Sequence, residues 1–164
     1  MLLLRFVSLL LLALWVGGAA VLASVGAPTI FAALEAHDPI TGRTLAGMVF
    51  GAVFARFQQL TWILGGLLIV VMATRAALGP RPRRFGLRIW TLAAMLSATL
   101  VSGFIIAPRI DAIRSRTAGA VADLPAGAPD KRDFGRLHGL STALMLFTIL
   151  GGAGLMYAEI KDSH

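Results

Sequence analysis

Four apolar stretches of about twenty residues each constrain the fold of this chain more than any other feature. They read FVSLLLLALWVGGAAVLASV after Arg5, FQQLTWILGGLLIVVMAT before Arg75, IWTLAAMLSATLVSGFIIA after Arg88 and GLSTALMLFTILGGAGLMYA after His138. A helix needs about 20 apolar residues to cross a hydrocarbon layer of about 30 Å. Only 14% of the residues are charged, whereas about 25% is usual in soluble domains.

We therefore predict an all-α, polytopic membrane protein with four transmembrane helices in a bundle. The chain would be one domain over residues 1–164, with spans at about 6–34, 45–77, 87–108 and 137–158. The first stretch also resembles a signal peptide with small residues for cleavage. Its apolar run continues to Leu34, which favours an uncleaved helix.

The connection RAALGPRPRRFGLR, between the second and third stretches, carries five arginines and no acid. By the positive-inside rule this loop faces the cytoplasm. We predict a multi-pass protein of the bacterial inner (plasma) membrane with both termini cytoplasmic. The net charge of +7 arises from basic residues beside the apolar stretches. The expected partner is therefore the lipid bilayer and not a nucleic acid.

Depth along the helices places several unusual residues in one layer. About 20 residues of helix span about 30 Å. Counting that far from the cytoplasmic charges reaches Ala27-Pro28, Arg56, Pro108 and His138, all at the outer interface. The apolar segments outside this layer predict that the first two helices project past the bilayer and pack together, or tilt strongly. Gly47 and Gly51 form a GxxxG that would allow close helix contact.

Short motifs recur in the same order in both halves of the chain. Ala-Pro is followed by Gly-Arg and then Ile-Leu-Gly-Gly, first at residues 27–66 and again at residues 107–152. This predicts two hairpins related by an axis along the membrane normal. Proline kinks or ends a helix, so we expect each Ala-Pro to redirect the chain at the headgroup boundary. The alternative is that two kinks open a cavity between the helices.

Three interpretations compete for the polar residues of the outer layer. The first is an anion- or ligand-binding site formed by Arg56, Arg109, Arg136 and His138. The second is a metal site at His37 and His138, for haem iron or copper. In that case Met48, Met95 and Met145 are further soft ligands for Cu(I). The third, which we favour, is a structural network of ion pairs such as Arg109 with Asp111 and Arg136 with Asp133.

Enzymatic and transport motifs are missing from the sequence. There is no cysteine, no recognisable nucleophile spacing, no phosphate-binding glycine loop and no HExxH. The absence of a charged residue at mid-bilayer depth argues against proton-coupled transport.

The stretches WVGG, APTIF, AGMVFGAVFARF and FGRLHGLST resemble the transmembrane-protein-205-like family, also described as domain of unknown function 4149. The resemblance spans nearly the whole chain. It implies a compact four-helix membrane protein with no established reaction, and a eukaryotic member has been linked to metal-drug export. A fainter likeness is to four-helix copper-resistance and haem-binding families, which use histidines within helices.

The leading functional prediction is a structural or accessory role, as a subunit of a larger membrane complex or through self-association. The alternative is a binding or transport protein for a small ligand, metal or haem at the outer interface.

Overall fold

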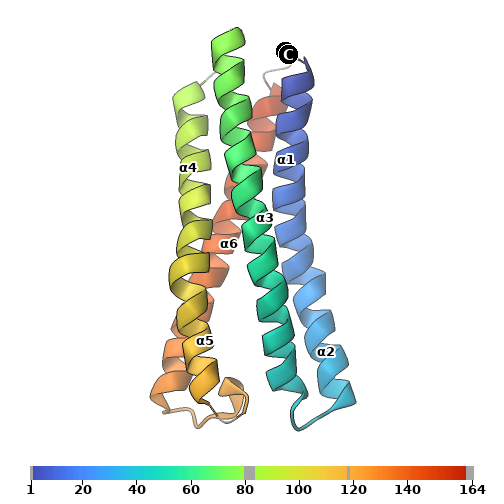
Figure 1. Ribbon diagram of the computed structural model, residues 1–164, viewed down its shortest axis with the longest axis vertical. Helices are drawn as coiled ribbons and strands as arrows, with labels where there is room; N and C mark the ends of the chain where they lie inside the picture. Colours follow the sequence, from blue (N-terminus) through green and yellow to red (C-terminus); the bar gives the residue numbers. More distant parts are fainter. Residues whose placement is uncertain (1, 80–83, 118, 162–164) are drawn as a thin grey trace.

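The computed structural model describes residues 2–79, 84–117 and 119–161, and the regular elements in these ranges are all helices. Figure 1 shows them as long rods lying side by side. In chain order they are α1 (Leu2–Val21), the π-helical turn η1 (Leu22–Gly26), α2 (Ala27–His37), α3 (Gly42–Leu78), α4 (Phe85–Val101), the π-helical turn η2 (Ser102–Ile106), α5 (Ala107–Arg116), the 3-10 turn η3 (Val121–Asp123) and α6 (Pro129–Lys161).

Each of the four rods is longer than a bilayer requires. The continuous helical segments are Leu2–His37, Gly42–Leu78, Phe85–Arg116 and Pro129–Lys161, and all are apolar enough to span. At about 1.5 Å per residue they are roughly 48–56 Å long, against a hydrocarbon core of about 30 Å. The four-helix membrane architecture predicted from the sequence is confirmed.

The two ends of the bundle contain different parts of the chain. The terminal end carries the start of α1, the end of α3, the start of α4 and the end of α6, and the hairpin end carries the opposite ends of the four rods (Figure 1). At the hairpin end α2 packs along α3, and α5 packs against α6. This pairing of α2 with α3 is one of the two arrangements expected for the apolar extensions.

Neither Ala-Pro motif ends its helix. Pro28 and Pro108 lie at the start of α2 and α5, and each follows a five-residue π-helical turn. Proline offers no N–H, and its ring collides with the carbonyl four residues earlier. Those carbonyls belong to Ser24 and Phe104, inside the two π turns, where the wider helix gives the ring room. The helices continue for 11 and 10 residues after the π turns, so neither proline ends its helix, and redirection of the chain by a kink stays a prediction.

The internal repeat has a structural counterpart in which residues are buried. Ser8, Leu12 and Trp15 of α1 are buried, and so are the residues 80 positions later, Arg88, Leu92 and Met95 of α4. The two π turns are also 80 positions apart. The element order α, π, α, then a long helix therefore occurs twice, as hairpin 1 (residues 2–78) and hairpin 2 (residues 85–161).

The Ile-Leu-Gly-Gly motifs of α3 and α6 correspond with a shift of one residue. Thr61, Gly65 and Leu68 are buried on α3, and Thr148, Gly152 and Leu155 are buried on α6, 87 positions later. A methyl group at Gly65 would lie 2.9 Å from Leu96 and 3.2 Å from Trp15, and one at Gly152 would lie 2.3 Å from Val16. These two glycines bring α3 and α6 against α1 and α4, and aliphatic side chains of all four helices fill the core between them.

Candidate functional site

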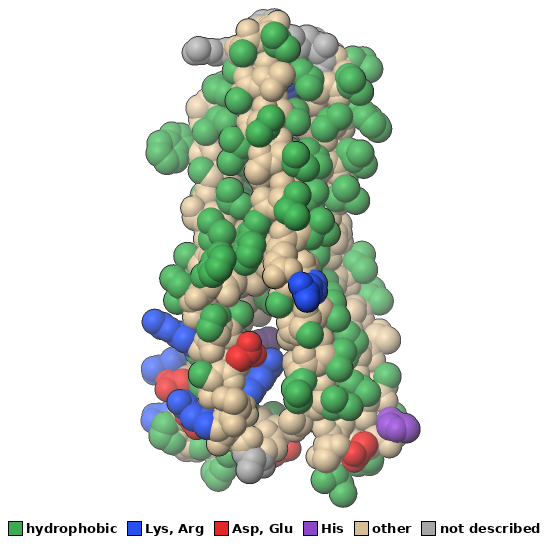
Figure 2. All heavy atoms as spheres, viewed as in Figure 1, with side chains coloured by type: hydrophobic (Ala, Val, Ile, Leu, Met, Phe, Trp, Pro, Cys, Tyr) green, Lys and Arg blue, Asp and Glu red, His purple; other side chains and the backbone are tan. Residues whose placement is uncertain are grey.

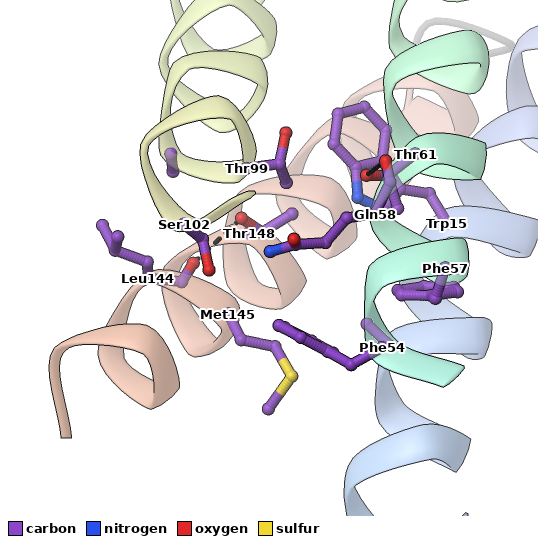
Figure 3. A pocket seen from close by; sticks show the side chains of 12 residues that line it. Trp15, Phe54, Phe57, Gln58, Thr61, Thr99, Ser102, Leu144, Met145 and Thr148 are labelled. Carbon is purple, nitrogen blue, oxygen red and sulfur yellow. Dashed lines mark hydrogen bonds between the residues drawn. The ribbon is translucent and has the colours of Figure 1, made fainter. Parts of the chain in front are cut away.

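A central cavity lies between the two hairpins. Its volume is about 30 Å³, which is room for about two water molecules. Twelve described residues from all four rods line it, and all are uncharged (Figure 3). They are Trp15, Ala19, Phe54, Phe57, Gln58, Thr61, Ala98, Thr99, Ser102, Leu144, Met145 and Thr148.

Gln58 is the unusual side chain of this cavity. It is 4% exposed, and Figure 3 shows its carboxamide reaching into the space between α3 and the α4–α6 side. Within the described part of the chain its side chain makes no hydrogen bond. A buried carboxamide normally has partners for its two N–H groups and its oxygen. The cavity therefore presents an amide whose hydrogen bonds the protein does not supply.

The two threonine hydroxyls beside Gln58 already donate hydrogen bonds to backbone carbonyl oxygens. Thr61 donates to the Gln58 carbonyl oxygen at 2.8 Å, and Thr148 donates to the Leu144 carbonyl oxygen at 2.9 Å. Ser102 and Ser141 share one hydrogen bond at 3.2 Å between their hydroxyl oxygens. Thr61 and Thr148 can therefore accept a hydrogen bond from an occupant of the cavity but have no proton left to donate.

The repeat explains where the cavity lies. Thr61 and Thr148 occupy corresponding positions of α3 and α6, and Gln58 corresponds to Met145. Ser102, on the α4 side, belongs to the π turn η2. Substrate sites of repeat-built membrane proteins lie at the interface of the repeats, beside interrupted helices, and π turns are frequent at functional sites.

A second polar cluster is buried at the terminal end, and each rod contributes one residue. We call Arg5, Arg75, Arg88 and Glu159 the Glu159 cluster. Arg75 Nη1 and Arg88 Nη1 each donate to Glu159 Oε1 at 2.8 Å. Arg5 Nη2 donates to the Glu159 carbonyl oxygen at 2.6 Å, and its Nε lies 4.0 Å from Oε2. The Glu159 side chain is only 4% exposed, so this cluster joins the four helices around a buried carboxylate.

This cluster was not predicted from the sequence. Arg75 and Arg88 were interpreted as topology signals, and Glu159 was not among the candidate residues. The available signal was the spacing of Thr148, Gly152, Leu155 and Glu159, which places the glutamate on the buried face of α6.

The residues predicted to form an outer site are all exposed and are not brought into contact. Arg56 on α3 hydrogen-bonds Gln59 on its own helix at 3.1 Å, and His138 on α6 stacks on Phe134. Among the described residues, no hydrogen bond or ion pair joins any two of Arg56, Arg109, Arg136 and His138. The arginine site therefore stays a prediction.

The ion pairs at the hairpin end differ from the two that were expected. Asp111 pairs with Arg114 at 3.6 Å instead of with Arg109. Arg116 pairs with Asp130, and Arg43 pairs with Glu35 at 2.9 Å and with Asp123 at 3.5 Å. No pair between Arg136 and Asp133 forms within the described ranges. The Arg43–Asp123 pair links hairpin 1 to the α5–α6 connection of hairpin 2.

The two candidate metal ligands lie in different hairpins. His37 ends α2 and His138 lies near the start of α6. Over the described ranges, no three His, Asp or Glu side chains come together as a metal site would need. Binding of a metal, haem or copper by His37 and His138 stays a prediction.

The GxxxG motif of α3 receives a side chain. A methyl group at Gly51 would lie 3.1 Å from Arg114 Nη1, and one at Gly47 would lie 3.6 Å from Nη2. The same guanidinium lies over the Phe134 ring, 5.6 Å from its centre. Arg114 of α5 therefore bridges α3 and α6 at the hairpin end, where Figure 2 shows a hollow between the two hairpins with Lys or Arg side chains at its edge.

Comparison with known proteins gives a family and no activity. The family described as domain of unknown function DUF4149 matches residues 10–118. No curated protein and no solved structure matches the chain. Because the match covers more than half of the residues, the chain belongs to the DUF4149 family.

Proposed function

We propose that this membrane protein binds a small molecule in the central cavity between its two hairpins. The observation that carries the proposal is Gln58, a side chain of a residue that is only 4% exposed, which lines the cavity and makes no hydrogen bond to another described residue. An amide in an empty cavity would lack hydrogen bonds, at a cost of about 1–3 kcal/mol, whereas an apolar residue of similar size would not need them. An occupant that completes its hydrogen bonds accounts for a glutamine at this position.

Access to the cavity is favoured from the hairpin end. The Glu159 cluster and an aliphatic layer including Leu68, Met72, Leu92 and Leu155 lie towards the terminal end. Gln58 is seventeen residues from Arg75 along α3, or about 25 Å. On the hairpin side, the molecular surface is hollowed between the two hairpins (Figure 2). A molecule can thus approach Gln58 from that side without breaking the buried ion pairs.

The structural or accessory role is the second candidate function. Gly17, Gly66 and Gly154 have open space where a side chain would be. A helix of another protein, or of a second copy, could approach the backbone closely at such positions. This role would leave the Gln58 cavity occupied by water alone.

We also propose that the protein lies in the bacterial inner membrane with both termini cytoplasmic, and that it is related to the transmembrane-protein-205-like family. The arginine-rich connection between α3 and α4 supports this orientation. Reporter fusions after Gly79 and Gly127 test it. The first should report the cytoplasm and the second the opposite side; the reverse result would invert the orientation.

Native mass spectrometry of the protein released from lipid nanodiscs tests the binding function. We expect the wild-type chain to carry a small molecule that Gln58→Leu loses. Gln59→Leu is the matched control, because Gln59 lies next to Gln58 on α3 but is exposed and bonds Arg56. A wild-type chain that carries no small molecule but a stoichiometric partner protein would favour the accessory role.

A further inference from the structure

We infer that the central cavity takes the hydroxyl head of an uncharged molecule whose apolar body extends towards the hairpin end. This inference rests on the proposed binding function and names the chemical class of the ligand. It follows from the hydrogen-bonding groups, the charge and the size of the cavity.

The cavity offers both donors and acceptors to its occupant. Trp15 is 1% exposed, and its indole, like the Gln58 amide, makes no hydrogen bond to another described residue. These two side chains supply N–H donors. Gln58 Oε1 and the hydroxyl oxygens of Thr61 and Thr148 supply acceptors. A hydroxyl group matches this mixture, because it accepts one hydrogen bond and donates another, whereas a carbonyl or ether oxygen only accepts.

The lining selects against ionised molecules. All twelve lining residues are uncharged. A carboxylate or an ammonium group would be buried without an opposite charge, which is far more costly than burying a neutral polar group. The buried charged groups of the Glu159 cluster cannot neutralise such a molecule, because they pair with one another on the terminal side of the aliphatic layer.

The size of the cavity limits what enters it. About 30 Å³ holds two waters or a hydroxyl with its adjoining carbon, whereas whole-ligand pockets measure about 300–1,000 Å³. The apolar part of the molecule must therefore lie outside the polar region. Phe54 and Met145, which Figure 3 shows facing the space between α3 and α6, provide an apolar surface for it.

Quenching of Trp15 fluorescence by brominated probes tests this inference. Trp62→Phe with Trp90→Phe leaves Trp15 as the sole tryptophan, and Phe at residue 62 retains an aromatic ring against Phe104. In nanodiscs, this protein is titrated with 6-bromohexan-1-ol, 6-bromohexanoate at pH 8 and 1-bromohexane. We expect saturable quenching by the alcohol alone.

Variants of the lining residues test whether the bromoalcohol binds in the central cavity. Gln58→Leu and, independently, the nearly isosteric Thr148→Val should each weaken binding of the bromoalcohol about fivefold or more, whereas Gln59→Leu should leave it unchanged. Two variants are used so that a folding defect in one does not decide the result.

The possible outcomes separate the class of ligand from the binding function. Saturable quenching by bromohexanoate at the same affinity would overturn the uncharged class while leaving the binding function standing. Equal, non-saturating quenching by all three probes would indicate partition into lipid, with water alone in the cavity, and would overturn both. Unchanged bromoalcohol affinity in both Gln58→Leu and Thr148→Val would overturn the assignment of the site.

Discussion

Removing the charge of Glu159 should destabilise the protein far more than removing the charge of an exposed glutamate that accepts from an arginine at nearly the same distance. Glu159→Gln keeps the shape of the side chain but removes the carboxylate charge that Arg75 and Arg88 both contact, and it leaves the buried Arg75 guanidinium facing a neutral group. Oε1 accepts from both at 2.8 Å. Hydrogen bonds to charged groups contribute about 1.5–3 kcal/mol each, and breaking a buried ion pair costs about 3–5 kcal/mol. We expect a loss of about 3–5 kcal/mol.

The matched control is Glu35→Gln. Glu35 accepts from Arg43 at 2.9 Å, nearly the same distance, but its side chain is 38% exposed, against 4% for Glu159. Exposed ion pairs contribute little, because water and salt screen them. We therefore expect almost no change in stability for this variant.

Unfolding in mixed dodecylmaltoside–SDS micelles measures both variants, with helicity as the signal. Raising the salt concentration should leave the Glu159→Gln deficit in place, because buried charges are poorly screened. Equal losses for Glu159→Gln and Glu35→Gln would refute the argument that burial makes the Glu159 cluster important. A stabilised Glu159→Gln variant would show that desolvation outweighs the attraction in the native cluster.

Three further predictions concern the hairpin end. Gly42→Ala would place a methyl group 2.1 Å from the Leu34 carbonyl oxygen, so the turn must open and hydrogen exchange of residues 38–42 should rise at least about tenfold, while an unchanged rate would contradict this packing. Hydrogen bonds from Thr41 and Ile40 lower the pKa of Asp38, so its contribution to stability is present above the usual aspartate pKa and is lost as pH falls through the lower, folded value. Amide protection factors in this turn, which compare each exchange rate with the intrinsic rate at the same pH, should fall with acid in the wild type, and Asp38→Ala should remove that dependence. Arg114→Ala removes the guanidinium that bridges Gly51 and Phe134, so spin labels at residues 45 and 132 should show a broader or longer distance distribution, whereas Arg109→Ala, which changes an exposed arginine, should not.

The predicted outer site and the observed internal sites show what sequence patterns cannot resolve. Depth counting placed Arg56, Arg109, Arg136 and His138 in one layer, yet it carries no information about which face of each helix a residue occupies. In the structure all four are exposed, and Gln58, two residues from Arg56, is the side chain that turns inward. Helical rise is readable from the sequence, whereas rotation about the axis depends on the packing of all four rods.

The sequence by itself determined the four rods and their repetition, because helix length and apolar content decide insertion into a bilayer. The sequence also pointed to both Ala-Pro sites, but it did not predict the π turns that precede them and let the helices continue. Only the tertiary structure decided which polar groups meet. Arg75 and Arg88 pair with Glu159 in the interior. Arg114 lies against the GxxxG motif, where close contact with a helix was expected. Gln58 faces the central cavity. Each outcome depends on contacts between residues far apart in the chain. These contacts decide which polar groups are buried, and burial decides how much an unpaired charge or amide costs in free energy.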